Sequence, residues 1–145
     1  MEQKIKKETE QAIRKSFSNQ EFMSMTGSSL LRIDIGYAEI EMPKAKFLIR
    51  KSGIFHGGMV SMLVDCAAGY AASAELGSED YLLTVELKVN FLRKAEGDRL
   101  LGIGKIIKSG RTLIITQVDV YACSGESNDK KSHVATALAT LMKTQ

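Results

Sequence analysis

Hydrophobic and polar residues follow a helical spacing through the middle of the chain. From Gly57 to Leu76 there is no proline, and the only charged residues are Asp65 and Glu75. Apolar residues recur there at the three- and four-residue intervals of a buried helix. These residues are Met59, Val60, Leu63, Val64, Ala67, Ala68, Ala71 and Ala72. The pattern therefore predicts one long apolar helix with a carboxylate near its middle.

Alternating apolar and polar residues predict β-strands on both sides of this helix. Residues 30–34 and 37–42 alternate around Gly36, which indicates a bent strand or two short strands. Four further runs, each ended by turn-forming residues, follow at 81–92, 100–108, 112–122 and 132–142. Because every break fits a hairpin, we expect an antiparallel meander with one face packed on the helix. The helix-facing residues expected on the first of these runs are Val85, Leu87, Val89 and Phe91.

The N-terminal segment carries an apolar stripe on a charged helix. Its members are Ile5, Ala12, Ile13 and Phe17, continued by Phe22, Met23 and Met25. We expect residues 1–27 to form a helical segment that covers the main domain, residues 28–145, with no linker between them. Residues 43–55 are rich in Lys and Arg and predict a basic loop that leads into the central helix.

Composition narrows the class of protein. The 145 residues suffice for one domain with its own core, and the net charge of +3 is too small to indicate a nucleic-acid partner. No signal peptide and no run of about 18 apolar residues is present, so we expect a cytoplasmic protein without a membrane span. Cys66 and Cys123 lack CxxC spacing and predict reduced packing thiols. With only two histidines, no metal or other cofactor is expected.

The residues that begin the central helix could bind an anionic oxygen. His56-Gly57-Gly58 exposes backbone N–H groups at a helix N-terminus, where they have no partner within the helix. Asp65, in an apolar stretch, requires a specific donor or an altered ionisation. The alternative is structural, in which Asp65 is a capped buried carboxylate, His56 packs, and the glycines allow close approach of helix and sheet.

Together, His56-Gly57-Gly58, Asp65 after six intervening residues and the strand sequence TVELKVNFLR at residues 84–93 resemble a known family. They are similar to the hotdog-fold acyl-CoA thioesterases of the phenylacetate-pathway type, over roughly residues 28–142. The resemblance implies an α+β hotdog fold, in which a long central helix is wrapped by a curved antiparallel sheet. It also implies an acyl-CoA substrate and homodimers paired edge to edge, which could assemble further as a dimer of dimers.

The resemblance also implies roles for residues on the central helix and its neighbouring strand. Asp65 would be the general base or the nucleophile, and the Gly57 amide, with Gly58, would stabilise the oxyanion. His56 would shape the turn or hydrogen-bond the carbonyl, and Thr84 would position the attacking water. Eight residues separate Gly57 from Asp65, about 12 Å along a helix, so a site with both requires two chains.

Basic residues are the candidates for binding the phosphates of coenzyme A. Arg93, Lys108 and Arg111 are the cations, with Ser109 and Gly110 forming a turn whose amides could meet phosphate. Asn90, on the same strand as Thr84, is a further candidate for contact with the substrate. Arg50 stands where the family often carries asparagine, and it would either bind an anionic substrate or face solvent.

Other functions compete with hydrolysis. A hotdog domain that binds acyl-CoA or acyl ligands without catalysis is the main alternative, although Asp65 favours an enzyme. A hydratase is weaker, because the spacing of His and Asp typical of that group is absent. The chain has no GxSxG elbow, so a serine hydrolase is unsupported.

Overall fold

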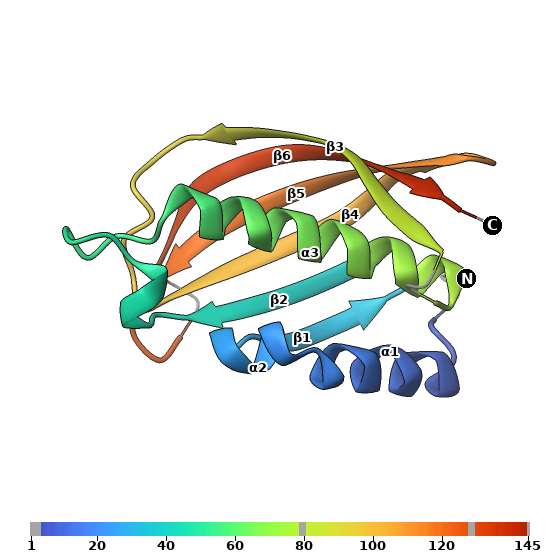
Figure 1. Ribbon diagram of the computed structural model, residues 1–145, viewed down its shortest axis with the longest axis horizontal. Coiled ribbons are helices and arrows are strands. Elements are labelled where there is room, and N and C mark those ends of the chain that lie inside the picture. Colours follow the sequence, from blue (N-terminus) through green and yellow to red (C-terminus); the bar gives the residue numbers. More distant parts are fainter. Residues whose placement is uncertain (1–3, 79–80, 128–129, 145) are drawn as a thin grey trace.

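The computed structural model describes residues 4–78, 81–127 and 130–144 (Figure 1). It contains the helices α1 (Lys7–Asn19), α2 (Glu21–Thr26) and α3 (Gly57–Leu76) and the short 3-10 helix η1 (Lys46–Leu48). The strands are β1 (Ser29–Asp34), β2 (Tyr37–Pro43), β3 (Leu82–Phe91), β4 (Arg99–Ser109), β5 (Leu113–Cys123) and β6 (Lys131–Lys143). All pair antiparallel in the order β1-β2-β4-β5-β6-β3, and the sheet curves around α3. The predicted α+β architecture is confirmed.

The prediction of a continuous meander is wrong for β3. This strand pairs with β6, not with β4, and forms one edge of the sheet. The connecting residues 92–98 cross the end of the sheet, where the Ala95 carbonyl accepts a hydrogen bond from Phe55 at 2.9 Å. Gly97 is needed in this connection, since a Cβ there would lie 2.7 Å from the Cys123 carbonyl oxygen. Turn-forming residues marked the end of the strand correctly but could not indicate where the chain went next.

A β-bulge changes which residues of β3 face α3. Thr84 pairs with Leu141 and Glu86 pairs with Thr140, so Val85 is an extra residue without a cross-strand partner. Leu87 packs against the core as expected, whereas Val85 is 57% exposed, contrary to the prediction. On the N-terminal side of the bulge the alternation is reversed, and Thr84 faces the helix.

The core lies between α3 and the concave face of the sheet. Leu63 and Ala67 of α3 have no exposed surface, and both lie against glycines of β4. A Cβ at Gly102 would approach Leu63 Cγ to 2.7 Å, and one at Gly104 would overlap the Ala67 carbonyl. These two glycines therefore set how closely the helix approaches the sheet.

Helix α1 packs beside β1 and against α3, and α2 packs against α1 (Figure 1). Ile13 and Phe17 of α1 are buried, and the Phe17 ring meets Tyr70 of α3 edge to face at 5.1 Å. Gln20 donates a 2.7 Å hydrogen bond to the Tyr70 hydroxyl. The predicted covering contact of α1 is present at these residues.

The apolar stripe is narrower than the sequence indicated. Met23 is buried, but Ala12, Phe22 and Met25 are exposed, and the expectation that they extend the contact surface is wrong. The short helix α2 turns only Met23 and Thr26, three residues apart, toward the core.

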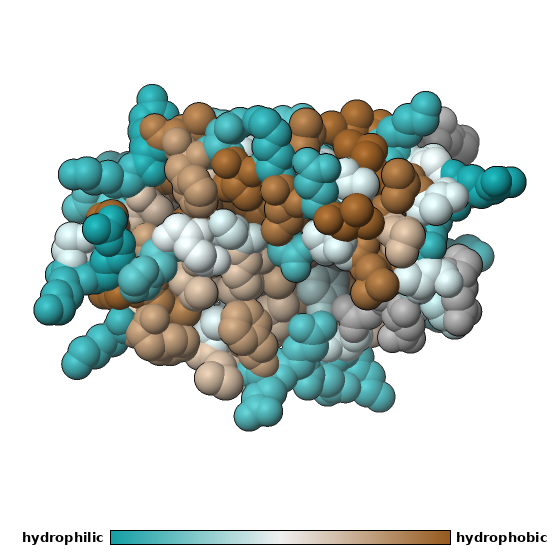
Figure 2. Space-filling model, turned by 45° about the horizontal axis from the view of Figure 1, so that its top comes forward, coloured by the Kyte–Doolittle hydropathy of each residue, from teal (hydrophilic) through white to brown (hydrophobic). Residues whose placement is uncertain are grey.

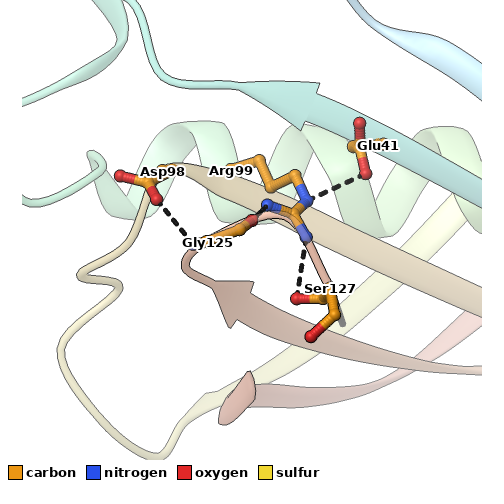
Figure 3. Close-up of polar contacts among 5 residues, drawn as sticks. All are labelled: Glu41, Asp98, Arg99, Gly125 and Ser127. Atoms are coloured by element: carbon orange, nitrogen blue, oxygen red, sulfur yellow. Dashed lines mark hydrogen bonds and ion pairs between the residues drawn. The ribbon is translucent and has the colours of Figure 1, made fainter. Parts of the chain in front are cut away.

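One arginine holds the turn between β5 and β6 (Figure 3). Arg99 forms an ion pair with Glu41 of β2 at 3.1 Å and donates to the Gly125 carbonyl at 2.6 Å and the Ser127 carbonyl at 3.2 Å. The Asp98 carboxylate accepts a 2.9 Å hydrogen bond from the Gly125 amide. The cluster fastens a turn to the sheet and is a structural contact.

No helix within the described residues is long and apolar enough to span a membrane. Cys66 and Cys123 are free, as the sequence indicated.

Candidate active site

Asp65 is paired with a hydroxyl from β3. It is half-buried on the side of α3 that faces this edge strand. Thr84 Oγ1 donates a 2.6 Å hydrogen bond to Asp65 Oδ1. The bulge at Val85 makes the contact possible, because it turns Thr84 to the same side as Leu87. The donor that the sequence required for Asp65 is thus Thr84.

The thiol next to Asp65 is not a nucleophile. Burial, with a smaller effect of the Asp65 charge, raises the pKa of Cys66 to about 12. Its thiol therefore stays protonated near neutral pH, and it contacts Met62 Sδ at 3.4 Å.

The beginning of α3 presents unsatisfied backbone donors. His56 is the N-cap, with extended backbone, and its carbonyl accepts hydrogen bonds from Met59 and Val60 at 2.9 and 3.2 Å. The amides of Gly57 and Gly58 have no acceptor in the part of the chain that the structure describes. The His56 side chain is exposed and makes no cap, so its effect here is on the backbone turn.

A depression of about 330 Å³ opens beside Gly57. Its apolar lining comes from the segment before α3, from α3 itself, from β3 and the residue after it, and from β6. These residues are Ile54, Phe55, Val60, Phe91, Leu92 and Val134, and Ala95 of the connection after β3 adds to them. Three cations, Arg50, Arg93 and Lys94, line the same depression. Gly57, at the beginning of the helix, and this positive charge therefore line one space.

Arg93 and Arg50 were singled out by their sequence positions, and the structure brings both to the Gly57 depression. The Arg93 side chain is exposed there, and its Nη1 donates a 3.3 Å hydrogen bond to the His133 carbonyl. Lys94 is not among the residues that the sequence singled out, and its position next to Arg93 is the one signal that could have identified it. Val134 comes from β6, so no local pattern connects it with Gly57.

The other proposed phosphate ligands lie at the opposite end of the sheet. Lys108 and Ser109 end β4, and Arg111 lies in the turn to β5. Lys143 Nζ donates to Ser109 Oγ at 3.2 Å and to the Gly110 carbonyl at 2.8 Å. The Gly110 amide donates to Leu113 at 2.8 Å, so the expectation of a free amide there is wrong. Asn90 is exposed, and its Oδ1 accepts a 3.4 Å hydrogen bond from Lys88.

The edge of β3 leaves apolar side chains uncovered. Figure 2, in which the β3 side is turned forward, shows hydrophobic residues gathered on this face of the molecule. Those on β3 and directly after it are Leu83 and Val85, each 57% exposed, Phe91, also 57% exposed, and Leu92, 46% exposed. Among residues 4–78, 81–127 and 130–144, no strand pairs with the outer edge of β3.

Comparisons with solved structures identify proteins of the same shape. A thioesterase family protein from Silicibacter pomeroyi is 37% identical, with a TM-score of 0.82 over 92% of this chain and 96% of that chain. The Escherichia coli PaaI protein of the phenylacetic acid degradation operon shares the fold, with a TM-score of 0.80 at 18% identity. That alignment covers 96% of this chain and 95% of the PaaI chain.

Comparisons of sequence also find thioesterases and esterases. Residues 52–127, which include both Gly57 and Asp65, match the profile of the thioesterase superfamily. A candidate esterase of Saccharolobus solfataricus is 31% identical over 109 residues, 75% of this chain and 71% of the relative. The medium/long-chain acyl-CoA thioesterase YigI of Escherichia coli is 24% identical over 136 residues, 83% of this chain and 84% of the relative.

Proposed function

The chain belongs to the thioesterase superfamily and is a thioester hydrolase, and on that premise we propose that it cleaves acyl-CoA at a site shared by two subunits. The products are a free acid and coenzyme A. The observation that carries the proposal is the 2.6 Å hydrogen bond from Thr84 to Asp65. Asp65 lies on the same helix, α3, as the unsatisfied Gly57 amide.

Asp65 supplies the base or the nucleophile in this proposal. Thr84 occupies Oδ1, which leaves Oδ2 as the oxygen that can accept a proton from water. The resulting hydroxide attacks the thioester carbonyl, and the tetrahedral intermediate expels the thiolate of coenzyme A, which takes up a proton. In the nucleophilic variant Asp65 attacks directly, and water then hydrolyses the acyl anhydride.

The oxyanion of the intermediate requires donors near the reacting carbon. Gly57 N–H, with Gly58 beside it, suits this role because both are unsatisfied at a helix N-terminus. Within one chain these donors lie about 12 Å from Asp65 along α3, too far for one small reacting group. The proposal therefore pairs Asp65 with the partner subunit's Gly57.

Pairing of β3 with its copy would bring these groups together. Thr84 lies over Asp65, and Phe91 lies 3.5 Å from the position of a Cβ at Gly57. A two-fold axis next to Lys88 would place Thr84 opposite the partner subunit's Phe91, and so Asp65 near the partner subunit's Gly57. The same pairing would cover the apolar residues at the β3 edge.

This register also gives a role to the β4–β5 turn. Lys143, which holds that turn, pairs with Leu82 at the beginning of β3. In an antiparallel dimer, Lys108 and Arg111 of one subunit would therefore lie toward that end of the partner subunit at which the partner's α3 begins. Both side chains are exposed there and could meet the phosphates of coenzyme A.

Thiol release from a panel of acyl-CoA substrates tests the function. Asp65→Asn keeps the size and polarity of the side chain but removes the base, so kcat/KM should fall about 10²- to 10⁴-fold. The kcat/KM of Asp65→Ala should fall at least as far. Glu75→Gln is the matched control, because Glu75 is the other carboxylate of α3 and is exposed. It should retain activity.

Two results would contradict the proposal. One is the absence of turnover with every acyl chain in the panel. The other is turnover that Asp65→Asn and Glu75→Gln affect equally, since Asp65 would then have no special part in the reaction.

A further inference from the structure

The Gly57 depression holds more positive charge than a neutral thioester needs. Arg50, Arg93 and Lys94 line it together with the N-terminus of α3, whose dipole adds to the positive potential. Among the described residues, none of these three side chains is within ion-pair distance of a carboxylate. The thioester carbonyl carries no charge, so these cations point to an anion on the ligand.

The phosphates of coenzyme A lie well away from that anion site when the reacting carbonyl rests on Gly57 and the pantetheine arm is extended. The bonds from the thioester sulfur to the first phosphate span roughly 15 Å when extended. Arg50 and Arg93 instead line the same depression as Gly57, whose whole volume is about 330 Å³. With the arm extended, an anion inside this space belongs to the acyl half of the substrate.

The lining of the depression combines this charge with an apolar surface. Phe55 and Val60 are buried beneath it, and Phe91 and Val134 form its wall toward the sheet. Such a lining suits a short hydrocarbon chain. A hydrocarbon segment that ends in an anion would meet both parts of the lining.

Arg93 is positioned to receive a carboxylate. One N–H of its guanidinium is used by the His133 carbonyl at 3.3 Å, which limits where the side chain can move. The guanidinium has four further N–H donors, enough for a two-point contact with a carboxylate. Arg50 approaches from the loop before α3, on a different element.

We propose that the Gly57 depression selects acyl groups that end in a carboxylate, with Arg93 and Arg50 binding that carboxylate. The inference rests on the proposed function, because it takes the thioester carbonyl to lie at Gly57. It assigns Arg93 to the acyl group and leaves the phosphates to the β4–β5 turn.

Pairs of substrates with equal chain length test this selection. Succinyl-, glutaryl- and adipyl-CoA are compared with butanoyl-, pentanoyl- and hexanoyl-CoA, and the ratio of kcat/KM within each pair is measured. We expect the ratio to favour the carboxylate in the unaltered enzyme. Arg93→Met and Arg50→Met should each lower the ratio about 10- to 100-fold, the loss expected for a hydrogen bond between charged groups. A ratio does not depend on how much of a variant is folded.

Lys15→Met is the control for loss of one positive charge, because Lys15 is an exposed residue of α1. Its ratio should equal that of the unaltered enzyme. A second arm uses the same acyl groups on pantetheine, which lacks the nucleotide phosphates. If the arginines bind the acyl carboxylate, both variants lower the ratio by the same factor with pantetheine and with coenzyme A.

Other outcomes overturn the inference. One such outcome is a kcat/KM ratio near one in the unaltered enzyme. Another is that the arginine variants lose kcat/KM equally on both members of each pair. Either result shows that the arginines do not bind an acyl carboxylate. An equal loss that disappears with pantetheine thioesters would assign the arginines to phosphate instead. Hydrolysis of the neutral substrates in any of these cases leaves the proposed function standing, whereas no hydrolysis of any substrate contradicts that function itself.

Discussion

The direction of one hydroxyl group determines what Asp65 can do. Thr84 faces α3 only because Val85 is an extra residue in β3, and without the bulge the alternation would turn Thr84 away from the helix. Its hydrogen bond orients the Asp65 carboxylate and leaves one oxygen for water. A local irregularity of the strand is thus part of the proposed site.

Replacing Thr84 tests this role. Thr84→Val keeps the shape of the side chain but removes the donor, so kcat/KM should fall about 10- to 100-fold. Thr84→Ser keeps the hydroxyl and should recover most of the activity. The measurement is thiol release under identical conditions, and equal activities for the Val and Ser variants would show that the hydroxyl has no part in catalysis.

At the scale of single residues, the sequence singled out Asp65 and Gly57, the two ends of the proposed site, more clearly than the residues around them. Asp65 is a charge within an apolar helix, and Gly57 begins that helix, so each stands out from its local pattern. The orientation of Thr84 depends on pairing with β6, and Val134 reaches the Gly57 depression through the same sheet. Neither contact has a signal in neighbouring residues.

The packing of α3 on β4 depends on two positions without side chains. Gly102 and Gly104 lie directly beneath Leu63 and Ala67, and the helix would have to move away if either glycine gained a Cβ. Because Asp65 lies between these two helix residues in the chain, such a shift would also disturb its contact with Thr84.

Gly104→Ala should therefore destabilise the fold by about 1–3 kcal/mol, the usual cost of forcing extra atoms into a packed core. Gly69→Ala is the matched control, since a Cβ at this position of α3 would have nothing within 4 Å. Alanine in a helix interior should stabilise by about 0.5–1 kcal/mol relative to glycine. Urea unfolding measures both, and a neutral Gly104→Ala variant would contradict the close packing.

At the scale of elements, periodicity predicted the central helix and the strand segments to within a few residues, but it left open whether β1 and β2 are one bent strand or two. It failed for the placement of β3, because hydrophobic alternation does not specify which strand is its neighbour. The chain order suggested pairing with β4, but β3 pairs with β6 and has the free edge. That free edge is the feature on which the proposed dimer depends.

The whole molecule is incomplete as a catalyst in the proposed mechanism. One chain holds the base and the donors of the oxyanion site about 12 Å apart on α3. The exposed apolar residues of β3 and the unpaired strand edge favour association with a second copy. Two active sites would then form in each dimer, each with Asp65 from one chain and Gly57 from the other.

Two variants with different defects separate a shared site from a site within one chain. Asp65→Asn removes the base. Gly57→Pro removes the amide donor, and proline suits this first position of a helix, where His56 before it is already extended. Each variant alone should be inactive, with a loss of about 10²–10³-fold for the missing oxyanion donor. Gly57→Ala, which keeps the N–H, is the control for the added atoms.

The most direct measurement is the activity of dimers that contain one subunit of each variant, isolated with a different affinity tag on each chain. In such a dimer one site carries both defects, while the other combines an intact Asp65 with an intact Gly57. The account predicts about half of the unaltered activity for a two-fold symmetric dimer. Activity no higher than that of the separate variants would contradict a site shared between subunits.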